Sequence, residues 1–195
     1  GHGFHVHGPH DHELEHAQQG GHGGHGESGG MINQIAMFTA IIATVGAIFG
    51  YMGGATQANA GIYKNNAAIK KTEASNQWNY FQSKSTKQSL AELARDLAPA
   101  DKQAVYQAKV EKYEKEKTEI KLEAEKLEAE AKDWEHRSDE QMHQHHRWAQ
   151  STTVLQISIA LAAIALLTKK KWVEYAMFGA GGVGMVVGAL AALHI

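Results

Sequence analysis

Residues 101–178 read DKQAVYQAKVEKYEKEKTEIKLEAEKLEAEAKDWEHRSDEQMHQHHRWAQSTTVLQISIALAAIALLTKKKWVEYAMF and contain neither glycine nor proline. The chemistry of this run changes partway along. Up to Arg147 it is dominated by Glu, Lys and Ala, which favour a helix in water, and from Ser151 to Thr168 it is mainly apolar and contains no charged residue. No turn signal separates the two parts. We therefore predict one continuous helix that begins in water and ends in a membrane.

The whole chain has 195 residues, a formal net charge of -2 and 43% hydrophobic residues, but these averages hide a separation into polar and apolar blocks. It has no cysteine, which excludes disulfides and thiolate metal sites. Every glycine lies within residues 1–61 or 179–188, and no strand pattern appears. The sequence therefore predicts an all-α fold.

Three apolar segments are long enough to cross a membrane, for which about 20 residues suffice. We predict transmembrane helices over residues 31–54, 150–168 and 172–193. The first is expected to be an uncleaved anchor, because the residues before it lack the Lys and Arg of a signal peptide. Beyond their first and last turns, the three segments hold no acidic or basic residue. A pump, which usually needs such a group inside the membrane, is therefore not expected.

The segment between the first two spans, residues 55–149, is highly charged but balanced, with equal numbers of acidic and basic residues. Its middle reads LAPAD over residues 97–101. Pro99 disfavours a helix at Ala98, and Asp101 can cap the helix that follows. We predict a long, coiled-coil-like antiparallel hairpin that is inserted between the first and second of the three transmembrane helices.

The returning arm of this hairpin carries an apolar row with the seven-residue spacing of a coiled coil. The row consists of Tyr106, Tyr113, Ile120, Leu127 and Trp134. A weaker stripe on the outgoing arm consists of Ala67, Ala74, Trp78, Phe81, Leu90, Leu93 and Leu97. Because this stripe offers few large partners, we expect a neighbouring copy of the chain to complete the packing.

Glycines in the first and third spans repeat at the four-residue spacing that lets membrane helices approach closely. They form the pairs Gly46 with Gly50 and Gly184 with Gly188, and Gly181 shares the face of the second pair. We predict that these glycines, together with the coiled-coil row, pack a homo-oligomer, through contacts within or between its subunits.

Residues 1–30 form a tail rich in His and Gly, a composition that cannot bury a core. Its histidines lie close to acidic residues, and imidazole with carboxylate suits Zn, Ni or Cu. The predicted metal ligands are His5, His7, His10, His12 and His16. The alternative is a flexible, solvating tail without a metal.

A second group of histidines lies just before Trp148. Within it, Glu140 and His143 match the Glu-x-x-His unit of di-iron bundles, but the outgoing arm offers no second unit. We interpret this group as a polar collar that titrates near neutral pH.

The short loop Lys169–Lys171 joins the second and third spans. Positive residues in short loops stay on the cytoplasmic side of a membrane. This predicts a cytoplasmic tail and a hairpin on the opposite side.

Residues 78–87 read WNYFQSKSTK, and this run resembles the signature of a bacterial membrane family catalogued as domain of unknown function 4337. Residues 3–12, 145–150 and 155–159 are also similar to that family. The resemblance covers nearly the whole chain, in the same order of tail, span, charged hairpin and paired spans. It implies a multi-pass protein of the bacterial inner membrane, and it provides no catalytic residue. With that location, the orientation predicted from Lys169–Lys171 places the hairpin in the periplasm.

No phosphate loop, catalytic triad or nucleotide fingerprint appears, and the hairpin has no basic excess for nucleic acid. We therefore expect no enzyme and no nucleic-acid partner. The predicted function is that of a homo-oligomeric membrane scaffold or stalk, with the bilayer and other membrane proteins as partners. The alternatives are a metal-handling protein that uses the histidine tail, and a passive oligomeric pore lined by Gln34, Thr39, Thr44 or Gln156.

Overall fold

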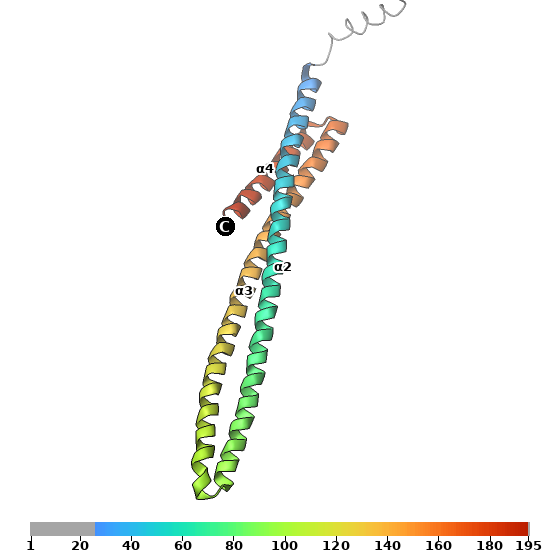
Figure 1. Cartoon of the computed structure of the whole chain (residues 1–195). Helices are drawn as coiled ribbons and strands as arrows, with labels where there is room; N and C mark the ends of the chain where they lie inside the picture. The colour runs from blue at the N-terminus through green and yellow to red at the C-terminus, as the bar shows by residue number, and fades with distance from the viewer. Residues whose placement is uncertain (1–25, 195) are drawn as a thin grey trace, which may run out of the picture. The chain divides into compact units, whose positions relative to one another are not determined.

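The structure is a computed structural model that describes residues 26–194. It consists of three α-helices, α2 (Gly26–Leu97), α3 (Ala100–Thr168) and α4 (Lys171–Ala192), and the described residues contain no strand (Figure 1). Each helix is long and apolar enough to cross a membrane. The prediction of an all-α fold with three long helices is therefore confirmed.

The arrangement differs from the prediction in one respect. The hairpin predicted over residues 55–149 is not a separate insertion, because its arms are the second part of α2 and the first part of α3. The predicted boundaries at residues 54 and 150 fall inside these two helices. Neither boundary has a proline to interrupt the backbone hydrogen bonds, so only the side-chain chemistry changes there.

Two compact units can be distinguished in the described chain. The apolar unit consists of residues 29–49 and 150–189, and the charged unit consists of residues 50–149 and 190–194. Their division along α2 and α3 follows the change from apolar to charged sequence.

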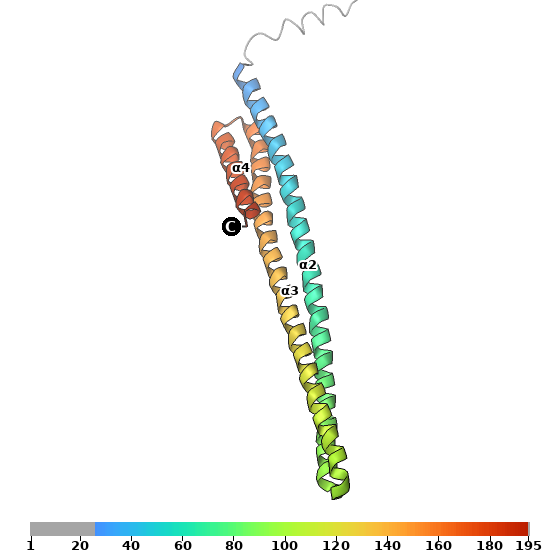
Figure 2. The same cartoon turned by 60° about the vertical axis from the view of Figure 1, so that its left-hand side comes forward.

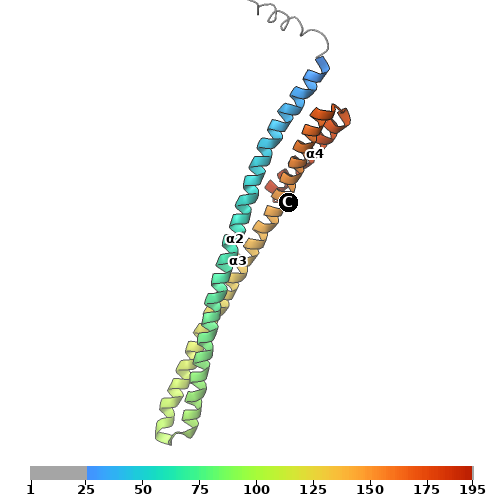
Figure 3. The same ribbon diagram turned by 90° about the vertical axis from the view of Figure 1, so that its right-hand side faces the viewer.

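The charged unit is an antiparallel pair of helices, made of residues 50–97 of α2 and 100–149 of α3 (Figure 3). The amide of Ala98 donates to the carbonyl of Arg95 at 3.2 Å, and the amide of Lys102 donates to the carbonyl of Pro99 at 2.9 Å. The turn between the helices therefore lies where the LAPAD sequence predicts it.

Small residues of α2 pack against larger ones of α3 in this unit. The buried α2 residues Ala60, Ala67 and Ala74 follow each other at seven-residue steps. The buried apolar α3 residues of this unit are Val110, Ile120, Ala124, Leu127, Ala131 and Trp148. The predicted apolar row therefore faces α2 of the same chain.

The aromatic members of that row lie at the edges of the contact. Tyr106, Tyr113 and Trp134 are half-buried, and the ring of Trp134 lies 5.4 Å from the ring of Tyr63 in α2. They pack beside the buried aliphatic residues instead of being enclosed by them.

The predicted stripe on the outgoing arm is wrong at its end, because Leu90, Leu93 and Leu97 are exposed. The side of α2 that faces α3 continues from Ala74 at seven-residue steps through Phe81 and on to Gln88, which are both half-buried. The three leucines are off this register and lie on other sides of the helix.

The apolar unit contains the first part of α2, the last part of α3 and most of α4. Its core consists of Ile35, Ala162, Ala165, Val173 and Met177. Its outer surface is also apolar, with exposed Ile and Val side chains at Ile41, Ile48, Ile157, Ile164, Val183 and Val186. Apolar side chains on both the inside and the outside of a helical unit are typical of a membrane span.

Helix α4 turns back along α3 after a very short link (Figure 2). Lys169 adopts a left-handed conformation with φ of 52°, and its amide donates to the carbonyl of Ala165 at 2.8 Å. A residue in this conformation ends a helix and reverses the chain.

Three glycines allow α4 to pack closely against α2 and α3. Gly181, Gly184 and Gly188 are buried on one face of α4. A Cβ atom added at these positions would overlap the side chains of Phe38, Leu155 and Phe49, respectively. This face of α4 therefore has no room for a larger residue.

Two buried serines of α3 strengthen the same contact. The hydroxyl of Ser151 donates to the carbonyl of Gly184, and that of Ser158 donates to the carbonyl of Met177, each at 2.7 Å. Both hydroxyls thus find acceptors within the apolar unit, as buried polar groups must.

The glycines of the first span differ from each other. A Cβ atom at Gly46 would lie 3.8 Å from Leu155, whereas one at Gly50 would meet no described atom within 4 Å. Gly46 and the three α4 glycines thus face side chains of their own chain, and Gly50 does not take part in this packing.

We expect Gly184→Val to destabilise the protein, because the added methyl groups would overlap Leu155. Overpacking of this kind costs about 1–3 kcal/mol, so the thermal midpoint of the purified protein in detergent should fall. The control is Gly182→Val, because a Cβ atom there meets no described atom within 4 Å. Equal midpoints for the two variants would contradict the close packing of α4.

Candidate functional site

The exposed side of α2 in the charged unit carries a row of uncharged residues that is not covered by any part of the described chain. The row follows alternating steps of three and four residues, the spacing of a coiled-coil seam. All of its members are exposed, although charged residues are frequent elsewhere in this arm. This α2 outer row consists of Ile62, Asn65, Ile69, Thr72, Asn76, Asn79, Ser83, Thr86, Leu90, Leu93 and Leu97.

The ends of the α2 outer row are strongly apolar. Its isoleucines and leucines are between 48% and 78% exposed, and its middle is made of Asn, Ser and Thr. A long row of this kind on a water-facing helix is suited to pack against another helix.

Another side of α2 contacts α3 through the motif at residues 78–87. The indole Nε1 of Trp78 donates to the carboxylate of Glu128 at 2.8 Å. The ammonium of Lys84 lies 2.6 Å from the carboxylate of Glu116, and only 13% of the Lys84 side chain is exposed. The motif that carries the family resemblance therefore connects the two arms of the charged unit.

Further ion pairs connect the arms closer to the apolar unit. The ammonium of Lys70 lies 3.1 Å from the carboxylate of Glu130, and that of Lys71 lies 2.6 Å from the carboxylate of Glu135. Because these groups are partly exposed, each pair contributes little by itself. Together they favour one register of α2 against α3.

These contacts shift the pKa values of the groups involved. The hydrogen bond from Lys84 lowers the pKa of Glu116 below its ordinary value of 4.5, and the same bond raises the pKa of Lys84 above 10.5. The hydrogen bond from Lys71 likewise lowers the pKa of Glu135. The carboxylates therefore stabilise the charged unit above pH 4.5, and this contribution is lost as the pH falls through their lower folded values.

Four histidines of α3 near the apolar unit form the histidine collar, which consists of His136, His143, His145 and His146. Glu140 contacts His136 at 3.3 Å, and both Glu140 and His143 are exposed. In the part of the chain that the structure describes, no group of three or more His, Asp or Glu side chains could hold a metal ion. The Glu-x-x-His sequence therefore does not form a di-iron site there.

One member of the collar contacts the backbone of α2. The Nδ1 atom of His145 lies 2.8 Å from the carbonyl oxygen of Gly53, an acceptor that requires the proton on Nδ1. Trp148 is buried beside Gly53. A Cβ atom added at Gly53 would lie 3.3 Å from the Cβ atom of Trp148. Gln144 reaches the end of the chain, 2.8 Å from the ring of His194. Through His145, the histidine collar therefore contacts the part of α2 that lies next to it in the charged unit.

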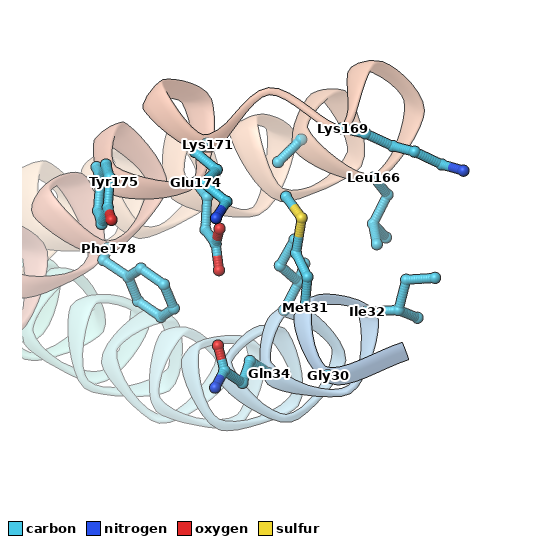
Figure 4. Close-up of a pocket in the computed structure, with 12 residues that line it drawn as sticks. Gly30, Met31, Ile32, Gln34, Leu166, Lys169, Lys171, Glu174, Tyr175 and Phe178 are labelled. Atoms are coloured by element: carbon cyan, nitrogen blue, oxygen red, sulfur yellow. The ribbon is translucent and has the colours of Figure 1, made fainter. Parts of the chain in front are cut away.

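The apolar unit contains a groove of about 510 Å³ between the first turns of α2, the end of α3 and the start of α4 (Figure 4). Its apolar walls come from Met31, Ile32, Ile35, Leu166 and Phe178. The side chains of Met31 and Phe178 point into the space between the helices. A groove of this volume is in the range of small-molecule sites.

Polar side chains line the same groove. The amide of Gln34 and the carboxylate of Glu174 point into it from opposite helices, whereas the stem of Lys169 extends away from it (Figure 4). Lys171 lines the groove next to Glu174, which is half-buried. Among the described residues, none of these four side chains has a hydrogen-bond or ion-pair partner. The groove therefore offers the Glu174 carboxylate, the Lys171 ammonium and the Gln34 amide to a ligand.

Comparison with known proteins gives one match. Residues 31–194 match the family model described as "Domain of unknown function (DUF4337)". The chain belongs to this family. The predicted family is thereby confirmed over residues 31–194, the similarity at residues 3–12 lies outside this match, and the family description assigns no activity. No curated protein and no solved structure matches the chain.

The other predicted sites have different outcomes. The proposed metal ligands His5, His7, His10, His12 and His16 lie outside the described residues, so the binding of Zn, Ni or Cu stays a prediction. Of the residues named for a pore, Gln34 lines the groove, whereas Thr39, Thr44 and Gln156 do not.

Sequence reasoning missed the role of Glu174. It lies in the first turn of α4, within the predicted third span, and was not considered as a candidate site residue. The signal that could have revealed it is an acidic residue within an apolar segment, three residues after a lysine, since ionisable groups in such segments usually have a function.

We expect Lys84→Met to lower the thermal midpoint at neutral pH and to reduce the loss of stability in acid. Without the lysine, the pKa of Glu116 returns toward 4.5, so less stability is lost below that value. The measurement is the thermal midpoint as a function of pH. Lys132→Met is the control, since it removes the same charge from an exposed residue of the charged unit that takes no part in lowering the pKa of Glu116. An unchanged pH dependence in Lys84→Met would exclude this ion pair as a stabilising contact.

His145→Ala should destabilise the protein by about 0.5–1.5 kcal/mol, the net contribution of one hydrogen bond, because the contact with the Gly53 carbonyl is lost. His146→Ala is the matched control, because His146 is the neighbouring residue and is exposed. Chemical unfolding of the two variants in the same detergent gives the comparison. An equal or larger effect of His146→Ala would show that the collar is stabilised in another way.

Proposed function

We propose that the protein is a homo-oligomeric membrane scaffold without enzymatic activity, and that its copies associate through the α2 outer row. The observation that supports this function is the row itself, a long series of exposed, uncharged residues at coiled-coil spacing on a helix that is otherwise rich in charge. Ionic side chains would face water equally well there, so their absence from every position of the row favours a partner helix.

A second copy of the chain is the partner that fits this row best. Copies in one membrane share one orientation. A two-fold axis along the membrane normal therefore places their α2 helices parallel, and each residue lies opposite the equivalent residue of the other copy. The leucines and isoleucines then pack at both ends. Asn76 and Asn79 meet their equivalents in the middle, and a polar Asn at such a position sets the register of a coiled coil.

The energetics of the charged unit favour this association. Its own interface buries only alanines among the apolar residues of the α2 arm, which leaves the larger apolar side chains of that arm available. Full burial of one Leu or Ile contributes about 1.5–3 kcal/mol. Five such residues in each copy provide enough to offset the entropy lost on association.

This proposal changes the position of the subunit contact. The row from Tyr106 to Trp134 was predicted to pack the oligomer through contacts within or between its subunits, and its contacts with α2 of its own chain favour the first. The outer row of α2 replaces it as the surface between copies.

The proposed topology has three membrane crossings. The apolar parts of α2, α3 and α4 cross the bilayer, and the charged unit lies between the first and second crossings as an antiparallel hairpin. The loop Lys169–Lys171 favours the cytoplasmic side, which places the charged unit on the opposite side, the periplasm of a bacterial inner membrane. An arm such as residues 50–97 is roughly 70 Å long at 1.5 Å per residue, long enough to keep partner proteins at a distance from the bilayer.

The parallel pairing of α2 can be tested by cysteine crosslinking, because the chain has no natural cysteine. Ser83 belongs to the outer row, so Ser83→Cys should form a disulfide-linked dimer when membranes are treated with a mild oxidant. Equal residues lie close together across a parallel seam, within the short reach of a disulfide.

Ser89→Cys is the matched control, because it is the same substitution at an exposed position beside the row. It should stay monomeric under the same conditions. A wild-type protein of monomeric mass in mild detergent, or equal crosslinking of the two variants, would contradict the proposal.

A further inference from the structure

The groove of the apolar unit lies at the level where α3 ends and α4 begins. If these helices cross a bilayer as proposed above, this level coincides with the boundary between acyl chains and headgroups. Trp172 and Tyr175, both exposed at the start of α4, are the residue types that favour such a boundary. The molecules that surround the groove are then phospholipids.

The groove divides into parts that match the parts of a phospholipid. Its apolar walls suit an acyl chain, and Lys171, which lines the groove, provides positive charge for a phosphate. Basic pockets between membrane helices on the cytoplasmic side bind lipid headgroups in this way. These features alone would accept any phospholipid.

Glu174 makes the groove selective. Its carboxylate points into the groove and has no basic partner among the described residues. A purely anionic headgroup would bring its phosphate close to this carboxylate and be repelled by it. A headgroup with a primary ammonium beside its phosphate satisfies both Lys171 and Glu174, and the Gln34 amide oxygen can accept from the same ammonium.

We propose that the groove between the start of α2, the end of α3 and the start of α4 binds a phospholipid with a primary-amine zwitterionic headgroup, of the phosphatidylethanolamine type. The phosphate contacts Lys171, the ammonium donates to Glu174 and Gln34, and one acyl chain lies against the apolar walls. This inference depends on the membrane crossing proposed above and is independent of the association of copies.

The test uses the full chain reconstituted into vesicles with equal amounts of phosphatidylethanolamine, phosphatidylglycerol and phosphatidylcholine that share the same acyl chains. The protein is then extracted in a mild neutral detergent, and the phospholipids retained per protein are measured by mass spectrometry. We expect phosphatidylethanolamine to exceed phosphatidylcholine about tenfold, the effect of one charge-assisted hydrogen bond, because a quaternary ammonium has no N–H to donate.

Variants assign the effect to the groove. Glu174→Gln should reduce the ratio of phosphatidylethanolamine to phosphatidylcholine to about one, since the charge that attracts the ammonium is removed. Lys171→Gln should lower the retention of all three lipids. Lys170→Gln is the matched control, because it removes the same charge from the same loop at a residue that does not line the groove, and it should behave as the wild type.

Two results would overturn the inference. The first is a wild-type protein that retains the three lipids in the proportions of the vesicles, an outcome that does not require any variant to fold. The second is enrichment of phosphatidylglycerol, which would identify a general anion site at Lys171. Failure of α2 crosslinking alongside selective retention would reject the oligomer and leave the lipid site intact.

Discussion

The structure depends on the ability of an α-helix to satisfy its own backbone hydrogen bonds in water and in lipid alike. Helix α3 passes from a charged sequence into an apolar one without a break, because nothing in its backbone must change where its surroundings change. What changes is how side chains hold the helices together. The charged unit uses alanines with ion pairs at its edges, such as Lys84 with Glu116. The apolar unit uses glycines and the backbone-directed hydroxyls of Ser151 and Ser158.

The two faces of α2 in the charged unit have separate roles. One face holds Ala60, Ala67 and Ala74 at the contact with α3, and the family motif at residues 78–87 adds polar contacts to the same interface. The other face holds the uncharged outer row. A helix with two seams at coiled-coil spacing can pack within its own chain and against a neighbour at the same time, as the proposed association of two copies requires.

Much of the fold could be predicted from the sequence, because its strongest signals are local. The absence of glycine and proline from residues 101–178 indicates the continuity of α3, and Pro99 indicates the turn. The partner of each helix face could not be predicted in the same way. Leu90 and Leu97 look like core residues in the sequence, yet the register of Ala60, Ala67 and Ala74 turns them outward. The groove was missed because Gln34 and Glu174 are far apart in the chain. They line the same groove only because α4 folds back along α3.

The link between α3 and α4 determines how the chain can enter a bilayer. Helix α3 ends at Thr168 and α4 begins at Lys171, and an extended residue spans at most about 3.5 Å. The apolar part of α3 and helix α4 therefore stay side by side, tied by the contacts of Ser151 and Ser158 with α4. In the proposed topology, so short a link favours entry of the two segments into the bilayer as one helical hairpin. Membrane insertion of the second half and folding of the apolar unit would then be coupled.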